Sequence, residues 1–273
     1  IQSGADRLSP QARQRFGLTS PKGAGIFVLD TREFAALAPL LNAEEQALVV
    51  PLGKTPEIGP FIYARKEEGP RLLYLDGRTP LSRLPALSAH LEPYRPLLEK
   101  RRECRLGRMP WWRLHWPRER ATFLGPGLLI PQRALRLRAA YAPEGAFTSV
   151  DVYHLLPRAK NGVPLFAWLA VLHSRAVHEW LFWRGKRKGP LLELYHTPLS
   201  ALPLPRLTPE SSACRTLAEI GLACHDFWMN AWQEQKGQGA WPAKAAKLSE
   251  SERWREFQER LDKAVETAYE SCG

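Results

Sequence analysis

Cysteine is scarce in this chain of 273 residues, and its few cysteines show no arrangement that would bind a metal ion. The four are Cys104, Cys214, Cys224 and Cys272, and none belongs to a C-x-x-C pair or to a Cys/His pattern of the kind that holds zinc. A chain of this length can bury enough apolar surface to fold without disulfides. We therefore expect free thiols, no metal site and a cytoplasmic protein, because thiols stay reduced in that compartment.

Long hydrophobic runs are also missing. No apolar run approaches the ~20 residues that a membrane-spanning helix needs, and no secretory signal peptide opens the sequence, so we expect no membrane partner. The sequence begins Ile1-Gln2-Ser3-Gly4 without an initiator methionine. We expect it to be a piece of a longer protein.

The sequence lacks a recognisable catalytic constellation. Residues 123–127 (Phe-Leu-Gly-Pro-Gly) match the F-x-G-x-G pattern of S-adenosylmethionine-binding loops, but Pro126 interrupts the pattern and a strand-like run follows where a helix should begin. Asp226 with residues 234–236 (Glu-Gln-Lys) imitates the D…E-x-K centre of many nucleases, but in a helical pattern rather than on adjacent strands. We expect no enzyme in this chain alone; an autonomous methyltransferase or nuclease would require one of these patterns to be functional.

Positive charge is what the sequence has in excess. It contains 39 Lys and Arg against 28 Asp and Glu, a net charge of +11. Residues 1–208 hold 31 basic and 17 acidic residues, whereas residues 209–273 hold 8 and 11. A basic body favours a polyanionic partner but says nothing about the fold.

The basic stretch at residues 99–138 is interleaved with tryptophan. Between Lys100 and Arg138, eleven Lys and Arg stand against two acids, and Trp111, Trp112 and Trp116 fall within six residues. Tryptophan faces can stack or wedge, and arginine forks match phosphates and guanine edges, so the combination suits a nucleic-acid surface. The alternative is that the tryptophans belong to the core and the arginines form a solvated rim.

A second basic segment, residues 184–190 (Arg-Gly-Lys-Arg-Lys-Gly-Pro), lacks the glycine spacing and the Ser/Thr of a P-loop. We interpret it as a glycine-flanked loop whose amides and three cations could bind a DNA backbone without reading its sequence. A solvated turn is the alternative.

Hydrophobic patterning predicts short strands with supporting helices. Strands are predicted at residues 25–30, 71–75, 127–131, 148–155 and 191–195, and helices from residue 31, at 87–102 and at 165–183. Pro93 and Pro96 conflict with the helix at 87–102. Twenty of the 24 prolines fall between residues 51 and 209, and beyond them two amphipathic patterns, at 213–227 and 254–268 and separated by residues 237–242, predict a helical tail.

Five blocks of the sequence occur in the order of a known family. They are residues 99–103 (Glu-Lys-Arg-Arg-Glu), 111–118 (Trp-Trp-Arg-Leu-His-Trp-Pro-Arg), 129–133 (Leu-Ile-Pro-Gln-Arg), 149–153 (Ser-Val-Asp-Val-Tyr) and 184–200, which begins with the second basic segment. Over residues 50–207 the chain resembles the TaqI-like C-terminal specificity domain of adenine-N6 DNA methyltransferases, including the fused type II restriction-modification enzymes. The family's catalytic domain carries an Asn/Asp-Pro-Pro-Tyr/Phe motif, whereas this chain has no Pro-Pro dipeptide.

The resemblance implies an α+β fold of short, mostly antiparallel strands with supporting helices, followed here by the helical C-terminal tail. It divides the chain into a connector from a missing catalytic domain at residues 1–50, a target-recognition domain at 51–208 and a helical extension at 209–273. It implies no cofactor in this chain, although the parent enzyme would use S-adenosylmethionine.

The expected function is recognition of a sequence in double-stranded DNA, which positions an adenine for methylation by a catalytic domain supplied in cis or in trans. Lys186, Arg187 and Lys188 are expected to contact phosphates. Six further residues are expected on or beside the reading surface: Arg108, Trp111, Trp112, Arg113, Arg133 and Arg136. The alternative function is a protein-interaction module, in which exposed aromatics of the acidic tail dock a catalytic subunit or a second copy.

Overall fold

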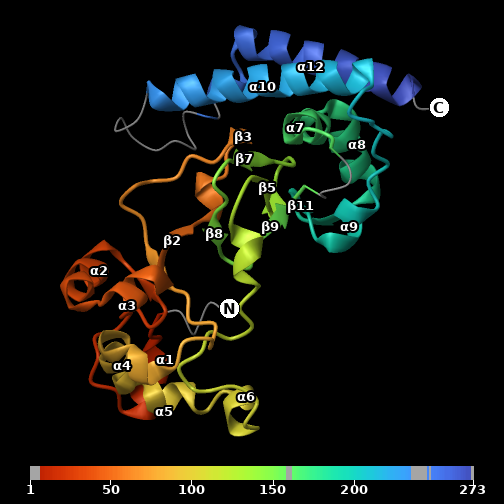
Figure 1. Ribbon diagram of the computed structural model, residues 1–273. Helices are drawn as coiled ribbons and strands as arrows, with labels where there is room; N and C mark the ends of the chain where they lie inside the picture. The colour runs from red at the N-terminus through yellow and green to blue at the C-terminus, as the bar shows by residue number, and fades with distance from the viewer. Residues whose placement is uncertain (1–6, 158–161, 235–244, 246, 272–273) are drawn as a thin grey trace. The chain divides into compact units, whose positions relative to one another are not determined.

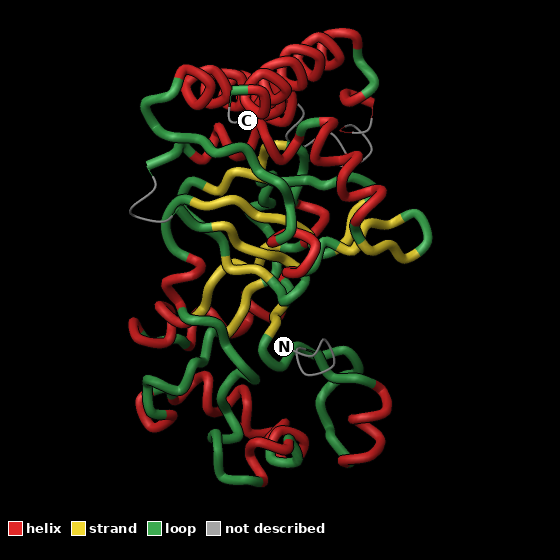
Figure 2. Tube along the Cα trace, turned by 90° about the vertical axis from the view of Figure 1, so that its right-hand side faces the viewer, coloured by secondary structure: helices red, strands yellow, loops and turns green. Residues whose placement is uncertain are grey.

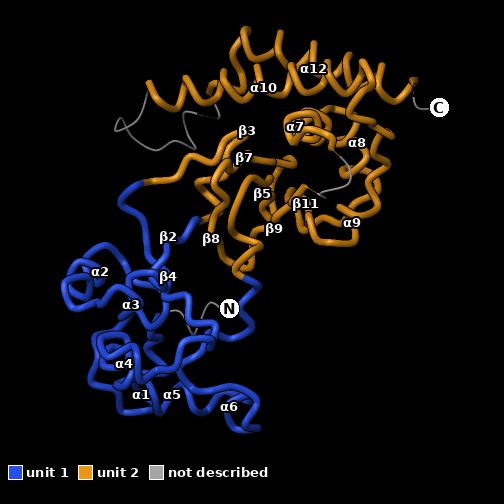
Figure 3. Tube along the Cα trace, viewed as in Figure 1, with its two compact units in different colours: residues 1–53, 67–119 blue, residues 54–66, 120–273 orange. Residues whose placement is uncertain are grey.

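The computed structural model describes residues 7–157, 162–234, 245 and 247–271, and the chain forms two compact units (Figures 1 and 3). Unit 1 comprises residues 1–53 and 67–119, and unit 2 comprises residues 54–66 and 120–273. The boundaries predicted at residues 50 and 208 do not coincide with these units. The reason is that segment 54–66 supplies a strand to unit 2, and the C-terminal helices pack on the same unit.

Unit 1 has a small antiparallel sheet with short helices around it. Its strands are β1 (Val28–Leu29), β2 (Val49–Gly53) and β4 (Arg71–Leu73), with β4 in the middle. Its helices are α1 (Pro10–Phe16), α2 (Thr31–Leu37), η1 (Ala38–Leu40), α3 (Ala43–Leu48), η3 (Leu81–Arg83), α4 (Pro85–Leu91), η4 (Glu92–Tyr94), α5 (Arg95–Leu98) and α6 (Arg102–Arg105). The helix predicted from residue 31 is confirmed, and a capping box begins it: the Asp30 carboxylate accepts from Glu33 N at 2.9 Å, and the Glu33 carboxylate accepts from Asp30 N at 2.8 Å.

The single helix predicted at residues 87–102 is wrong. The chain instead forms α4, the 3₁₀ turn η4 and the four-residue α5 in succession. Pro93 and Pro96 lack the amide that would continue an α-helical ladder, and each stands in the first turn of its own short element, where that amide is not needed.

Unit 2 contains the other strands and the longest helices. Its strands are β3 (Phe61–Ile62), β5 (Gly127–Pro131), β6 (Arg133–Ala134), β7 (Ala140–Ala142), β8 (Phe147–Thr148), β9 (Val152–Leu155), β10 (Lys186–Lys188) and β11 (Leu191–Glu193). Its helices are η2 (Thr55–Glu57), η5 (Arg120–Phe123), α7 (Leu165–His173), α8 (Arg175–Arg184), α9 (His196–Ser200), α10 (Ser212–Gln233) and α12 (Glu252–Glu270). Small, mostly antiparallel sheets with helices confirm the predicted α+β class.

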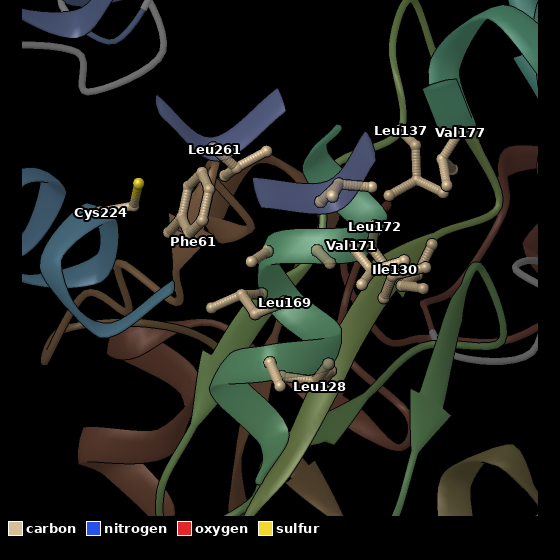
Figure 4. Close-up of a cluster of buried hydrophobic side chains, with 14 of the residues drawn as sticks. Phe61, Leu128, Ile130, Leu137, Leu169, Val171, Leu172, Val177, Cys224 and Leu261 are labelled. Atoms are coloured by element: carbon tan, nitrogen blue, oxygen red, sulfur yellow. The ribbon is translucent and has the colours of Figure 1, made fainter. Parts of the chain in front are cut away.

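The central sheet of unit 2 runs in the order β3-β7-β5-β9, with β3 parallel to β7 and the other neighbours antiparallel. Strand β5 is buried along its whole length because both of its faces are covered. Leu128 and Ile130 lie in the main core with α7 (Figure 4). Leu129 lies in a second cluster with Ala140 and Val152. This explains why a continuous apolar run, rather than an alternating one, forms the strand.

The helix predicted at residues 165–183 is two helices. Ser174 stands between them in an extended conformation (φ −69°, ψ 154°), so it ends α7 and begins α8. Its hydroxyl donates to Val171 O at 2.7 Å and accepts from Val177 N at 3.3 Å. One buried serine therefore satisfies backbone groups of both helix ends and turns the chain between them.

The two helices predicted for the tail are confirmed as α10 and α12, which are labelled in Figure 1 and are seen above the strands of unit 2 in the views of Figures 1 and 2. Helix α10 approaches α7 so closely that a Cβ on Gly221 would lie 2.0 Å from Phe166 O. Trp228 and Trp254 are 0% and 7% exposed, within the same core as α7. Trp228 and Trp254 are therefore not exposed aromatics that could dock a partner; they pack the C-terminal helices into the core of unit 2. Residues 237–242, predicted to separate the helices, lie outside the described residues.

No helix among the described residues is long and apolar enough to cross a membrane.

Candidate nucleic-acid interface

A three-stranded antiparallel sheet in the order β10-β11-β6 gathers basic residues from two distant parts of the sequence. Lys186 stands opposite Glu193, and Glu193 stands opposite Arg133 on the other side. Directly opposite residues share a face of a sheet, and residues two apart share it too. Lys186, Lys188 and Arg133 therefore share one face.

The other face of this small sheet turns toward the core. Leu192 is 2% exposed and Ala134, its partner on β6, is 5% exposed. Arg187 is opposite Leu192 and so belongs to this second face, where its guanidinium lies 4.5 Å from the centre of the Phe182 ring. The three cations are predicted to bind phosphate together, but they lie on opposite faces of the sheet. Lys186 and Lys188 share one face, and Arg187 lies on the other.

The second basic segment is not the loop that the sequence predicts. Lys186–Lys188 is an edge strand, so its backbone groups are paired with β11 on one side, and only its other edge is open. The three side chains are exposed, and none makes an ion pair with a residue that the structure describes. They are therefore free to meet a polyanion, and the side chains rather than a cradle of amides carry that capacity.

Arg133 is held in place on this face. Its guanidinium donates to the Tyr195 hydroxyl, lies 5.7 Å from the centre of the Tyr195 ring and lies 3.6 Å from the Glu193 carboxylate. Because Glu193 neutralises part of its charge and Tyr195 fixes its direction, Arg133 has the restraint expected of a side chain that reads a base edge rather than of a mobile phosphate contact.

Two exposed aromatic residues beside this sheet are not among the residues that the sequence predicts for the site. Trp183, the penultimate residue of α8, is 76% exposed and packs edge-to-face on Phe182 at 5.0 Å. Phe182 is in turn covered by Arg187. The sequence does contain a signal for them, because Phe182 and Trp183 directly precede the basic segment at residues 184–190. Aromatic residues beside basic ones are also the reason why residues 111–118 were predicted to bind nucleic acid.

The four predicted residues of unit 1 have mixed environments. Arg108 is exposed, whereas Trp111, Trp112 and Arg113 are partly buried. Arg101 holds this segment from beneath by donating to Trp111 O and, at 2.8 Å, to Arg113 O. Burial lowers the pKa of the Arg101 guanidinium. Arg95 lies 5.2 Å from the centre of a Trp111 ring.

Trp116 is the most exposed of the three tryptophans in residues 111–118, with 71% of its surface accessible. Its φ of 52° lies in the left-handed region that a bulky residue rarely adopts. The neighbouring His115 is 2.9 Å from the Glu103 carboxylate. Trp111 and Trp112, but not Trp116, are among the residues predicted for the site, because a residue pattern does not reveal which of three nearby indoles turns outward.

Arg136 lies in the irregular segment between β6 and β7, and it lines the same cavity in unit 2 as Arg133. The structure therefore brings Arg133 together with Lys186 and Lys188 through the sheet, and with Arg136 through the cavity. Four of the remaining predicted residues belong to unit 1.

The two enzyme-like patterns have clear positions in the fold. Residues 123–127 lead into strand β5, and Asp226 lies within helix α10, while Lys236 of the nuclease-like pattern is outside the described residues. Among the residues that the structure describes, no group of three or more His, Cys, Asp or Glu side chains could hold a metal ion.

Comparison with solved structures finds a match for this fold. The chain is similar to the Type IIL restriction-modification enzyme MmeI, whose structure was determined in complex with DNA. The TM-score is 0.62 at 16% sequence identity. The match covers 90% of this chain and 31% of the enzyme, so the chain spans about a third of its neighbour's length. In fold, the chain resembles part of a restriction-modification enzyme. No family model matches the sequence, and no curated protein matches it.

Proposed function

We propose that this chain is the target-recognition portion of a site-specific adenine-N6 DNA methyltransferase or type II restriction-modification enzyme. It binds double-stranded DNA and positions an adenine for a catalytic domain outside this chain. The observation that carries the proposal is the sheet face that joins Lys186 and Lys188 to a restrained Arg133. The similarity in fold to part of an enzyme that was solved with DNA supports it.

The chemistry of this face suits a division of roles. Two exposed lysines on an edge strand act as point charges that neutralise phosphates and fix the position of the duplex. Arg133, fixed by Tyr195 and Glu193, supplies a planar fork that can make two hydrogen bonds to a guanine in the major groove. Trp183 offers an open aromatic surface beside them.

The methyl transfer itself belongs to a different domain in this proposal. An adenine must leave the base stack before its amino group can be methylated, and contacts around the site help to offset the cost of unstacking. The chain would supply those contacts and no cofactor of its own, while S-adenosylmethionine would bind the catalytic domain. The resemblance to TaqI-like specificity domains over residues 50–207 supports this finer assignment.

The decisive experiment is selection of bound duplexes from a random pool, followed by sequencing, at two salt concentrations. An enriched short motif that contains adenine is the expected result. An Arg133→Gln variant should lose about 1–3 kcal/mol of discrimination at one position of that motif and keep the others. Absence of binding at low salt would refute the DNA proposal, and equal losses at every position would refute the role of Arg133.

A further inference from the structure

A cavity of about 1130 Å³ lies within unit 2. Its walls come from the segment after β6, from the junction of α7 and α8, and from α12. Leu137 is buried against Val177 and anchors this segment in the core (Figure 4). The residues on either side of Leu137, Arg136 and Arg138, both line the cavity.

Arg138 makes no ion pair with the residues that the structure describes. Its Nε atom is buried and has no hydrogen-bond partner among the described residues, and burial lowers the pKa of its guanidinium. Arg136 also makes no ion pair within the described part of the chain. Buried donors in native proteins are nearly always satisfied, so the buried Nε of Arg138 indicates a partner from outside the described residues.

The acids around the cavity do not supply that partner. The Glu179 carboxylate accepts from Arg175 Nε at 2.8 Å, and the Asp262 carboxylate accepts from Arg175 N at 2.7 Å and from Gln258 Nε2 at 3.1 Å. Glu250, the third acid of the lining, is exposed. Four arginines line the cavity, and Arg133 and Arg175 lie beside the carboxylates of Glu193 and Glu179. Arg136 and Arg138 are the two lining arginines that make no ion pair within the described residues.

Two neutral histidines complete the lining. Burial, followed by the charge of Arg136, lowers the pKa of His178, whose Nδ1 is buried without a hydrogen-bond partner in the described residues. Burial lowers the pKa of His173 to about 4, with a further contribution from Arg138. A neutral imidazole still offers one N–H donor. Two of the unsatisfied buried nitrogens of the described chain, on Arg138 and His178, therefore line one cavity.

We propose that this cavity binds a phosphate group, held by Arg136 and Arg138 with His178 as a further hydrogen-bond donor. A water molecule could satisfy the two buried nitrogens, whereas a phosphate satisfies them and also pairs with both guanidinium groups. The apolar part of the lining, including Ile58 and Leu172, and the volume leave room for an organic group attached to the phosphate. The phosphate can belong to a free small molecule or to a DNA backbone, and the proposal does not rest on the proposed function.

The test uses calorimetric titration of the full chain with pyrophosphate at low chloride concentration. Saturable binding is expected, and Arg138→Gln and Arg136→Gln should each weaken it about tenfold or more, as expected for loss of a hydrogen bond to a charged group. Arg260→Gln removes an equal charge from the exposed face of α12, away from the cavity lining, and should change the affinity by no more than about twofold. Absence of saturable binding, or equal weakening by Arg260→Gln, would overturn the proposal.

Thermal unfolding separates binding from folding. Pyrophosphate should raise the melting temperature of the unmodified chain more than that of either cavity variant, because it binds only the folded state. If Arg138→Gln fails to fold, Arg136→Gln still decides the matter, since Arg136 is exposed and its removal leaves the core intact. An equal rise in all three would overturn the proposal.

The source of the phosphate is decided by competition. If a duplex pool displaces pyrophosphate, and Arg138→Gln weakens duplex binding, the site takes a DNA phosphate. If duplex and pyrophosphate bind together, it takes a free ligand; both results support the site. Failure of the chain to bind DNA would remove the proposed function but leave pyrophosphate binding as a separate result.

Discussion

Replacing Lys186 and Lys188 by glutamine should flatten the salt dependence of DNA binding. Both side chains are exposed, share one sheet face and have no ion pair within the described residues, so each can neutralise one phosphate. Each phosphate contact contributes about −0.9 to the slope of log K against log salt, so losing two should reduce the slope by about 1.8. Between 50 and 200 mM salt, the unmodified chain should then lose roughly twelvefold more affinity than the double variant.

Fluorescence anisotropy with a labelled duplex at several salt concentrations measures this slope. The matched control is Arg260→Gln with Lys263→Gln, which removes the same charge from exposed positions of α12. If the control flattens the slope as much as the sheet variant, only the net charge matters and the assignment of the face is wrong. An unchanged slope in the sheet variant would exclude phosphate contacts by these lysines.

Three further predictions address other parts of unit 2. Trp183→Ala should weaken duplex binding by about 1 kcal/mol or more while leaving the salt slope and the melting temperature unchanged, because the indole is 76% exposed and uncharged; a lower melting temperature would show a structural role instead. Gly221→Ala should lower the free energy of unfolding by about 1–3 kcal/mol in urea titrations, because its Cβ would lie 2.0 Å from Phe166 O; Leu222→Ala, at the exposed neighbouring position, is the control, and an equal loss there would contradict the close approach. Unfolding free energy should fall by about 3 kcal/mol as the pH drops from 6.5 toward 4, because unfolded His173 takes up a proton at its ordinary pKa and the buried side chain, with a pKa of about 4, does not. Above pH 6.5 this group no longer reduces stability. The His173→Gln variant should be less stable, but its free energy of unfolding should change less between pH 6.5 and 4. If the variant shows the same change with pH, other groups cause the effect.

The parts of the fold that follow from local patterns were predictable. Strand β5 was identified with its observed bounds because three consecutive apolar residues, 128–130, lie between the turn formers Gly127 and Pro131. The helices at 213–227 and 254–268 were identified because their apolar positions recur at helical spacing. In each case the residues that define the element are neighbours in sequence.

The rest depended on contacts between distant residues. Ser174 ends one helix and begins the next through two hydrogen bonds of its hydroxyl, yet the apolar spacing continues through the junction and predicts one helix. Lys186–Lys188 has the composition of a solvated turn and becomes a strand because β11 pairs with it.

In the candidate site, too, local features could be predicted and contacts between distant residues could not. Its basic residues were visible in the sequence, but the sharing of a face by Arg133 and Lys186, which are 53 positions apart, follows only from the register of three strands. Likewise, the exposure of Trp183 and the burial of Trp254 could not be separated by composition, because both lie in amphipathic helices.

The short strand β3 has a consequence for transplanting unit 2 into another protein. Phe61 on this strand is fully buried, stacks on His173 at 4.0 Å and meets Trp254 edge-on at 5.5 Å, although residues 67–119 separate it from the remainder of its unit. A graft that begins at residue 120 would leave behind the strand parallel to β7 and the ring that fills the space between α7 and α12. Unit 2 is therefore discontinuous in sequence. A transplant that preserves its core has to include residues 54–273, and with them residues 67–119 of unit 1.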